Sequence, residues 1–472
     1  MTDGRSPDAP GWGQGTARRF LALAGGRAMA QALATVWFFA SARILSDSQF
    51  GLMAAGLAFF VVFAGIGDLG TTRTIVRHVA GDHASLWPTF RRAVPLRIAG
   101  GLGTALVVAG IVALLPVSVP GGVVLLAGLI ATASGVTELG YAGLRSIGRV
   151  RVETTLLVVE RAVFLAIALV VLDLGGGAVA VLLVYLATNT VSALVASWAV
   201  WRARPATTGR AGPLLDGEGR YTAASFAIVT VGPQIGPVLL ALFATATAVG
   251  LFSVAQSPIE GMTLFALSTA APLLPILRAH LTAGRRADAA HAAVSVVTAL
   301  TVAMIPVLVW FEVSPSMVLR LFYGAGRYEG AQNVLRLLAV TALAWAFRGV
   351  AEFVLLGEER ARRFLWITVA GAVVTIAAGI PLVVLHEAVG AAIAVLLGEA
   401  LMMVALLVSA PTLADRVARR AYAPVALAIV ASAVVLVVVR SSTLGSVVAV
   451  VVLEVVCGWK AVRSIRAIER RA

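Results

Sequence analysis

The feature that most constrains this chain is a succession of long apolar stretches separated by short polar segments. At 1.5 Å of rise per residue, a helix of about 20 residues crosses the ~30 Å hydrocarbon core of a bilayer. We therefore predict an all-α polytopic membrane protein with about 14 transmembrane helices. The apolar windows cover residues 20–42, 50–71, 93–115, 119–141, 152–172, 178–201, 222–245, 249–277, 290–311, 331–357, 364–385, 388–410, 422–439 and 444–458.

The composition supports the same class. Of the 472 residues, 60% are hydrophobic and 13% are charged, and the mean hydropathy is +0.96. A soluble chain of this length would need more polar residues to cover its surface. Cys457 is the single cysteine, which excludes an internal disulfide, and the five histidines lack metal-binding spacing. We expect no metal site.

The basic residues predict the orientation. With the N-terminus placed inside, 29 of the 37 Lys and Arg residues fall in inside segments and four fall in outside segments. Cytoplasmic loops are enriched in Lys and Arg, so both termini are predicted to be cytoplasmic in a multi-pass protein of the bacterial plasma (inner) membrane. This distribution also accounts for the net charge of +14, so no nucleic-acid partner is expected.

The sequence contains a weak internal repeat. The segment Ala-Val-Leu-Leu occurs at 180–183 and again at 394–397, and Glu138 and Glu352 are separated by the same offset of 214 residues. The Phe-Gly-Leu of the second window also resembles the Val-Gly-Leu of the eighth, at a shorter offset. Each half starts inside, so the halves have the same topology and should be related by an axis along the membrane normal.

This repeat predicts two six-helix bundles with a substrate path between them, followed by two extra helices. The predicted parts are a cytoplasmic N-terminal tail (1–19), an N-terminal bundle (20–201), a cytoplasmic connector (202–221), a C-terminal bundle (222–410), two further transmembrane helices (411–459) and a basic cytoplasmic tail (460–472).

Charged residues inside the windows are candidate site residues, because an ionised group near the bilayer centre costs about 3 kcal/mol or more. Arg27 follows Gly25 and Gly26 in the first window, and it is either a cation of the central cavity or a side chain that snorkels to the headgroups. Asp68 and Arg73 close the second window, where they either line the cavity or form a solvated helix end.

Spacing relates the other candidates. Glu138 and Arg145 are seven residues apart, so they share one helical face, and Arg348 and Glu352 are four apart, so they can pair within one helix. That internal pair is one interpretation; the other is that the repeat-related Glu138 and Glu352 face each other across the cleft. Glu260 lies two residues after Pro258 in the eighth window.

No enzymatic or cofactor site is expected. The sequence has no phosphate-binding GxxxxGK[ST] loop, and no segment outside the windows is long enough for a catalytic domain. Energy must then come from an ion gradient or from the gradient of the substrate.

Several short segments resemble bacterial polysaccharide transporters, the O-antigen and capsule flippases of the multidrug/oligosaccharidyl-lipid/polysaccharide exporter superfamily. Their order and spacing carry the resemblance, which covers about 18–410. The segments are Ala-Arg-Ile-Leu-Ser at 42–46, Gln-Phe-Gly-Leu at 49–52, Asp-Leu-Gly at 68–70 with Arg73 and Arg77, Val-Gly-Leu-Phe-Ser-Val-Ala at 249–255, Leu-Phe-Tyr-Gly at 321–324 with Tyr328, and Gly-Ala-Ala-Ile-Ala at 390–394.

The resemblance implies a V-shaped, pseudo-symmetric pair of bundles that moves a polyprenyl-diphosphate-linked oligosaccharide or polysaccharide precursor from the cytoplasmic to the outer leaflet by alternating access. The implied partners are this lipid-linked glycan, membrane lipids, a glycan polymerase or glycosyltransferases, and a coupling ion, H⁺ or Na⁺. No cofactor is implied. Arginine suits the diphosphate because its planar fork binds two oxygens.

The resemblance also gives expected roles to the charged residues. Related murein-precursor flippases carry cations to which Arg27 and Arg73 are similar, but Glu260 stands here where they have a base. The expected diphosphate-binding cations are Arg27, Arg73, Arg145 and Arg348, and the expected cavity or gate acids are Asp68, Glu138, Glu260 and Glu352.

Two other functions stay open at this point. A cation-coupled multidrug exporter of the same superfamily would use one of the cavity acids to bind its ion. A non-transporting scaffold for glycan assembly would not depend on the intramembrane arginines.

Overall fold

The computed structural model describes residues 14–68, 70–114, 117–205, 209–212, 219–270, 279–280, 283–357 and 360–409. These residues form helices and short turns, and no strand occurs among them, as the sequence predicted. The two further helices predicted at 411–459 and the basic tail predicted at 460–472 lie outside the described residues.

The helices follow the apolar windows. They are α1 (Gln14–Ile44), α2 (Asp47–Asp68), α3 (Thr71–Gly81), α4 (Leu86–Leu114), α5 (Gly121–Ser146), α6 (Val150–Asp173), α7 (Ala178–Arg202), α8 (Gly219–Val231), α9 (Ile235–Phe243), α10 (Ala246–Ala270), α12 (Arg286–Val313), α13 (Pro315–Tyr323), α14 (Gln332–Gly357) and α15 (Ala361–Ser409), with short 3₁₀ turns η1 (His83–Ser85), η2 (Gly232–Gln234) and η3 (Glu329–Ala331).

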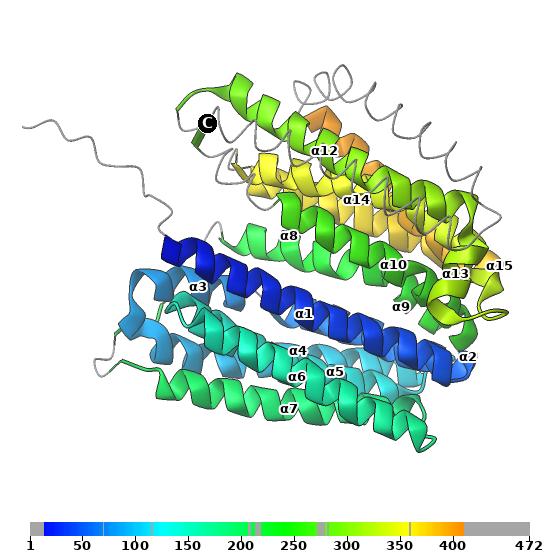
Figure 1. Ribbon diagram of the computed structural model, residues 1–472, viewed down its shortest axis with the longest axis horizontal. Helices are drawn as coiled ribbons and strands as arrows, with labels where there is room; N and C mark the ends of the chain where they lie inside the picture. The colour runs from blue at the N-terminus through cyan, green and yellow to red at the C-terminus, as the bar shows by residue number, and fades with distance from the viewer. Residues whose placement is uncertain are drawn as a thin grey trace, which may run out of the picture.

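The helices gather into two groups (Figure 1). In the first, α5 packs against α4, α7, α2 and α3, while α1 packs on α6. In the second, α14 and α15 pack together with α8, α9, α10 and α12 around them. Helix α2 joins the groups, because it contacts α8, α9 and α10 of the second group. The chain therefore has two helical groups, and the exact domain limits set from the sequence stay predictions.

Helix α15 is a hairpin of two helices. Its backbone leaves the helical region at Glu387, which lies between the two apolar windows predicted there. A Cβ on Gly379 would contact Ala394, one on Gly371 would contact Met402, and one on Gly398 would contact Thr375. The sequence numbers in these pairs run in opposite directions, so the two halves are antiparallel.

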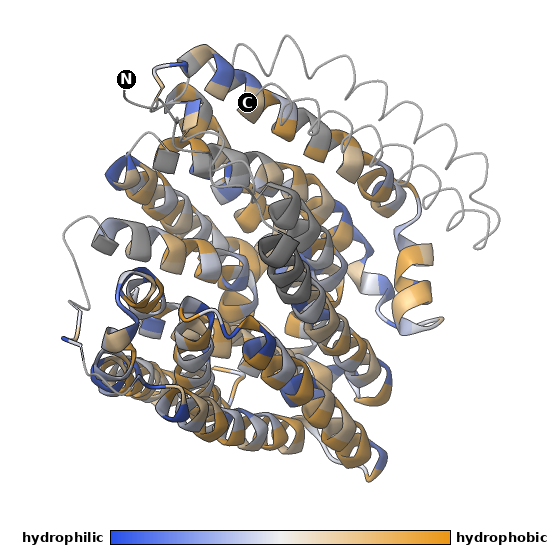
Figure 2. Ribbon diagram, turned by 60° about the vertical axis from the view of Figure 1, so that its left-hand side comes forward, coloured by the Kyte–Doolittle hydropathy of each residue, from blue (hydrophilic) through white to orange (hydrophobic). Residues whose placement is uncertain are grey.

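The molecule has the dimensions and the surface of a multi-pass membrane protein. In the described part of the chain, seven helices are long and apolar enough to span a bilayer, or eight if the bent pair formed by the end of α12 and α13 is one span. Large apolar side chains such as Leu106, Leu194 and Trp366 lie exposed on the outside. Figure 2 shows hydrophobic colour along the helices and hydrophilic colour mainly near their ends. A bilayer accounts for this exposed apolar surface.

Two glycines let α2 of the first group approach α10 of the second group closely. A Cβ on Gly51 of α2 would lie 1.7 Å from the carbonyl oxygen of Ala246, and one on Gly250 of α10 would lie 3.3 Å from the carbonyl oxygen of Asp47. Gly51 and Gly250 are the equivalent glycines of the repeat, and Asp47 and Ala246 have the same separation in sequence. The contact is thus symmetric, as expected near a two-fold axis that relates the halves.

The contact predicts that Gly51→Ala destabilises the protein, because its Cβ overlaps a backbone oxygen that no side-chain rotation can move. Overpacking of this kind costs about 1–3 kcal/mol or more. Thermal unfolding in detergent measures the effect. Gly110→Ala is the control, since nothing lies within 4 Å of a Cβ at that helical position. Equal melting temperatures for the two variants would contradict the close approach.

Candidate functional site

A charged cluster lies where α5 ends and α6 begins, and it contains three of the predicted site residues. Arg145 contacts Glu153 through Nη2 at 2.6 Å and Nε at 3.0 Å, and its Nη2 lies 3.4 Å from Glu138. Arg27 of α1 reaches the same Glu153 oxygen at 3.3 Å. Glu153 is therefore shared by two arginines from different helices. We call Arg27, Glu138, Arg145 and Glu153 the N-group cluster.

Local sequence explains how this cluster forms. The seven-residue spacing places Glu138 and Arg145 on one face of α5, as predicted. Gly148 has a φ of 77°, a left-handed conformation that favours glycine, and it lets the chain turn into α6. Gly26 lies against Thr154, since a Cβ on this glycine would be 2.8 Å from the Thr154 Cβ. Helix α1 therefore approaches α6 closely enough for Arg27 to meet Glu153.

Burial differs sharply within the N-group cluster. The Glu153 side chain is 1% exposed, whereas Arg27 is 49% exposed and Arg145 is 25% exposed. The Glu153 carboxyl is thus buried, whereas the two guanidinium groups are partly exposed to the surroundings. Such an arrangement holds two cations in place while leaving part of their hydrogen-bonding capacity open to an anion.

Asp68, at the end of α2, has several polar partners, and its side chain is 30% exposed. Arg97 of α4 is 5% exposed and forms an ion pair with Asp68. The Thr72 hydroxyl donates to Asp68 Oδ1 at 2.6 Å, and the Thr71 hydroxyl donates to the Asp68 carbonyl at 2.7 Å. Arg97 lies in the apolar window predicted at 93–115, and the structure makes it a buried partner of the second helix.

Arg73 connects the two groups. Its guanidinium carbon lies 3.1 Å from the centroid of the Phe226 ring on α8. Burial lowers the pKa of Arg73 to about 10, and the carboxyl groups of Glu352 and Asp68 oppose this shift. Arg73 therefore remains a cation at neutral pH, held between α3, α8 and α14.

Arg348 forms its ion pair with Glu399, which lies on another helix. Arg348 Nε lies 3.1 Å from Glu399 Oε2 on α15, and both residues are buried. Glu352 is also buried, and it interacts electrostatically with Arg348 on its own helix and with Arg73. Glu138 and Glu352 thus belong to different surroundings among the described residues.

Glu260 is the predicted acid with the most distinct surroundings. Its Oε1 accepts hydrogen bonds from Gln256 Nε2 at 2.6 Å and from Gln234 Nε2 at 3.3 Å.

A second set of polar side chains lies in the N-terminal half. There the Tyr141 hydroxyl donates to Glu160 at 2.9 Å, and Arg161 donates to the Tyr185 hydroxyl at 2.9 Å.

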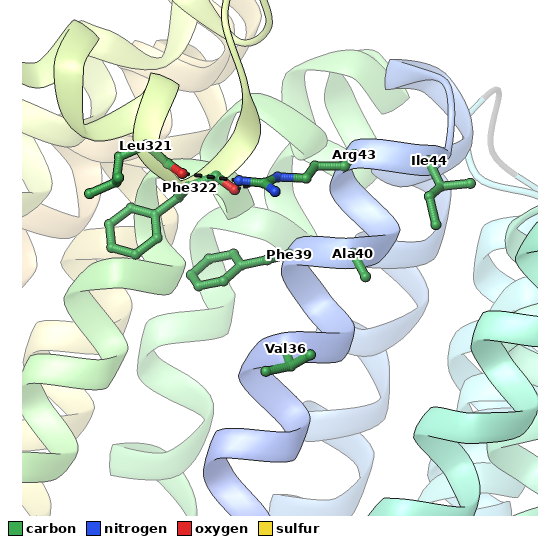
Figure 3. Close-up of a pocket in the computed structure, with 7 residues that line it drawn as sticks. All are labelled: Val36, Phe39, Ala40, Arg43, Ile44, Leu321 and Phe322. Carbon is green, nitrogen blue, oxygen red and sulfur yellow. Dashed lines mark hydrogen bonds between the residues drawn. The ribbon is translucent and has the colours of Figure 1, made fainter.

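Two arginines connect the groups where the end of α1 meets α13. We call this end of the molecule the α13 end. Arg43 donates to the carbonyl oxygens of Leu321 and Phe322 at 3.0 and 2.9 Å (Figure 3). Arg327 donates to the carbonyls of Arg43 and Leu45 at 2.6 and 2.7 Å and to Asp47 Oδ1 at 2.9 Å. We call these contacts the α13-end lock.

Tyr328 completes the lock. Its hydroxyl donates to the Ala42 carbonyl at 2.8 Å, and its backbone has a φ of 58°, an uncommon conformation for a non-glycine residue. Burial raises the pKa of Tyr328 to about 12, so the hydroxyl keeps its proton at neutral pH. Beside the lock, an apolar pocket of about 400 Å³ is lined by Val36, Phe39, Ala40, Arg43, Ile44, Leu321 and Phe322.

The sequence missed four partners in these sites. Glu153, Arg97 and Glu399 each pair with a predicted residue from another helix, and Arg327 forms the lock from a connecting segment. A charge inside an apolar window was the available signal for Arg97, Glu153 and Glu399. Arg327 lies in a polar segment and gave no such signal.

The family comparison gives one match. The model of the polysaccharide biosynthesis protein family matches residues 17–278. Among curated protein sequences, none matches the chain.

Solved structures show the same fold. The lipid II flippase MurJ in an inward closed conformation is 11% identical and has a TM-score of 0.66, with 95% of this chain and 99% of that chain covered. A MATE transporter in complex with MaL6 is 15% identical and has a TM-score of 0.57, with 85% of this chain and 96% of that chain covered. A MOP superfamily transporter from Pyrococcus furiosus is 14% identical and has a TM-score of 0.53, with 85% of this chain and 96% of that chain covered. These neighbours are transporters and a flippase, not enzymes.

The Arg348–Glu399 pair yields a stability prediction. Glu399→Leu leaves a buried guanidinium without its counter-charge, which costs about 3–5 kcal/mol of unfolding free energy. Arg348→Leu combined with Glu399→Leu should recover most of this loss, since the double variant removes both charges of the pair. Unfolding in detergent measures each variant, and Arg320→Leu is the control, because its pair with Glu329 is exposed. A double variant less stable than Glu399→Leu alone would contradict the pairing.

Proposed function

Because this chain belongs to the polysaccharide biosynthesis protein family, we propose that it is a flippase for a polyprenyl-diphosphate-linked oligosaccharide or polysaccharide precursor. The substrate moves from the cytoplasmic to the outer leaflet by alternating access. The protein lies in the bacterial plasma membrane with both termini in the cytoplasm, as the arginine distribution predicts. Its lipid-linked substrate comes from glycosyltransferases on the cytoplasmic side and passes to a glycan polymerase outside.

One observation carries this proposal: Arg27 and Arg145 share a single buried carboxyl, Glu153. A phosphate group offers the same bidentate acceptor geometry as a carboxylate. The diphosphate therefore binds by exchanging with Glu153 for the two guanidinium groups. Since the cluster also contains Glu138, its formal charge is zero without substrate, so the arginines are stable in an apolar bundle until the anion arrives.

The other predicted residues fit a path along the boundary of the two groups. Arg73 and Glu352 approach each other from opposite groups, so a rocking motion changes their separation. Arg348 stays paired with Glu399 and serves the packing of the second group, while Asp68 and Arg97 fix the end of α2. The glycan crosses in water while the prenyl chain remains in the bilayer.

The α13-end lock supports a state closed toward the outside. Its bonds run from residues 42–47 of the first group to residues 321–328 of the second. Opening toward the outer leaflet requires these bonds to break. The N-group cluster, which is remote from the lock, is then loaded from the cytoplasmic side.

The first test is accumulation of inner-leaflet lipid-linked glycan in a depletion strain. We expect wild type to clear the precursor and Arg145→Gln to fail, because an amide cannot replace the fork that binds phosphate. Arg151→Gln is the matched control, since Arg151 is an exposed arginine at the start of α6. Clearance of the precursor by Arg145→Gln would show that Arg145 is not part of the site, but it would not contradict the flippase proposal.

Depletion without precursor build-up would overturn the flippase proposal. A drug-sensitive strain with normal surface glycan would then favour a cation-coupled exporter. Lost glycan assembly that every intramembrane arginine variant rescues would favour a scaffold.

The lock gives a separate prediction. Arg327→Gln removes donors to two carbonyls and to Asp47, so the outward-open population should rise. In a Cys457→Ser background carrying Met53→Cys, labelling by an impermeant maleimide from outside should accelerate about tenfold, as a shift of 1.4 kcal/mol gives. Arg320→Gln, a surface arginine of α13, should leave the rate unchanged. Equal rates for both variants would show that the lock does not hold the outer side.

A further inference from the structure

Arg43 differs from the other arginines at the α13 end, because it lacks an acidic partner. Arg327 forms an ion pair with Asp47. Arg320 forms one with Glu329. Among the described residues, no acid pairs with Arg43, whose side chain donates only to two main-chain carbonyls. A guanidinium group has five N–H donors, so three of them and the positive charge remain available to an anion.

The apolar pocket of about 400 Å³ lies directly beside this cation (Figure 3). Apart from Arg43, every residue that lines it is apolar. The rings of Phe39 on α1 and Phe322 on α13 stack with their centroids 4.9 Å apart. Val36 and Ile44 are 53% and 51% exposed, so the pocket opens on the outer surface of the helices, where the bilayer lies.

The cation and the pocket are arranged like the two parts of a phospholipid. Val36 and Arg43 are seven residues apart on α1, which corresponds to about 10 Å along the helix. Figure 3 shows Val36, Ala40 and Arg43 in succession along α1. Arg43 lies in the last turn of this helix, at the level of the headgroups, and Val36 lies deeper, at the level of the hydrocarbon chains. A lipid chain beside Val36 therefore brings its phosphate to Arg43.

The chemistry of Arg43 favours an anionic headgroup. A phosphodiester accepts two parallel hydrogen bonds from a guanidinium group. A zwitterionic headgroup carries an ammonium beside its phosphate, which weakens the attraction to Arg43, whereas phosphatidylglycerol keeps a net negative charge. Lipid chains already have apolar surroundings in the bilayer, so the pocket fixes the position of the lipid and Arg43 selects its headgroup.

We propose that Arg43 and the adjoining pocket bind one anionic phospholipid of the outer leaflet, with the phosphate on the guanidinium group and one acyl chain in the pocket. This site is separate from the N-group cluster, where both arginines already face a carboxylate. It also differs from the general lipid surroundings of the helices, because it holds a single molecule that is selected by its headgroup. The binding does not depend on which substrate the protein moves.

The position of the site predicts an effect on the α13-end lock. The bound lipid contacts α1 of the first group and α13 of the second group at once. Opening toward the outer leaflet separates these helices, so the lipid binds the closed state better and raises its population. This consequence, unlike the binding itself, rests on the proposed transport function.

Native mass spectrometry of the purified full-length chain in detergent tests the binding. Phosphatidylglycerol and phosphatidylcholine with identical acyl chains are titrated separately, and the fraction of protein that retains one lipid gives an apparent Kd. We expect phosphatidylglycerol to bind about fivefold more tightly, the factor that ~1 kcal/mol per arginine gives. Arg43→Gln should abolish this preference, whereas Arg43→Lys, which keeps the charge but not the fork, should retain most of it. Arg320→Gln, a surface arginine of α13, is the control.

Filling the pocket is an independent test, since it leaves Arg43 unchanged. Ala40→Trp places a ring where the acyl chain is expected, so it should weaken phosphatidylglycerol binding at least as much as Arg43→Gln does. Leu194→Trp is the matched control, because Leu194 lies exposed on α7, away from the pocket. Size-exclusion profiles identify any variant that fails to fold.

Equal binding of the two lipids by wild type would overturn the proposal, and so would unchanged phosphatidylglycerol binding by Ala40→Trp. No glycan takes part in these measurements. Selective lipid binding by a protein whose depletion causes no precursor build-up would therefore keep the lipid site and reject the flippase. Normal precursor clearance together with equal binding of both lipids would keep the flippase and reject the lipid site.

Discussion

The cost of an unpaired charge in an apolar interior decides how this chain is built. Among the described residues, the buried charges Arg97, Glu153, Arg348 and Glu399 each have a partner of opposite charge on another helix. The pairs Asp68–Arg97, Glu153–Arg145 and Arg348–Glu399 therefore also fix which helices are neighbours. Two opposite charges that pair cost less to bury than two unpaired charges. Such a pair also specifies how the two helices are aligned, which apolar side chains alone leave open.

The symmetric contact at Gly51 and Gly250 is the second organising feature. Two halves that share a topology can pivot about such a contact, because small residues let two backbones touch without interlocking side chains. The charged sites do not follow the symmetry. The first half has two arginines on one carboxyl, whereas the second has an acid among amides.

Local spacing predicted the fold and part of the site. The apolar windows gave the helices and the break at Glu387, and a seven-residue spacing placed Glu138 beside Arg145. What the sequence could not give were contacts between helices. Glu153 and Glu399 lie within apolar stretches, and their partners depend on helix rotation and crossing. Arg348 has an acid at the favourable four-residue spacing, yet it pairs with Glu399, because tertiary approach outweighs a weak contact along one helix.

The α13-end lock consists almost entirely of arginine donors and main-chain acceptors. The carbonyls of Arg43, Leu45, Leu321 and Phe322 accept these bonds, so the side chains at the accepting positions contribute little to them. The acceptor residues can therefore drift in evolution while the closure persists, provided that the backbone path is kept. Pairwise covariation between these positions should be weak, and a search for coevolving residues would overlook a connection that the two arginines maintain.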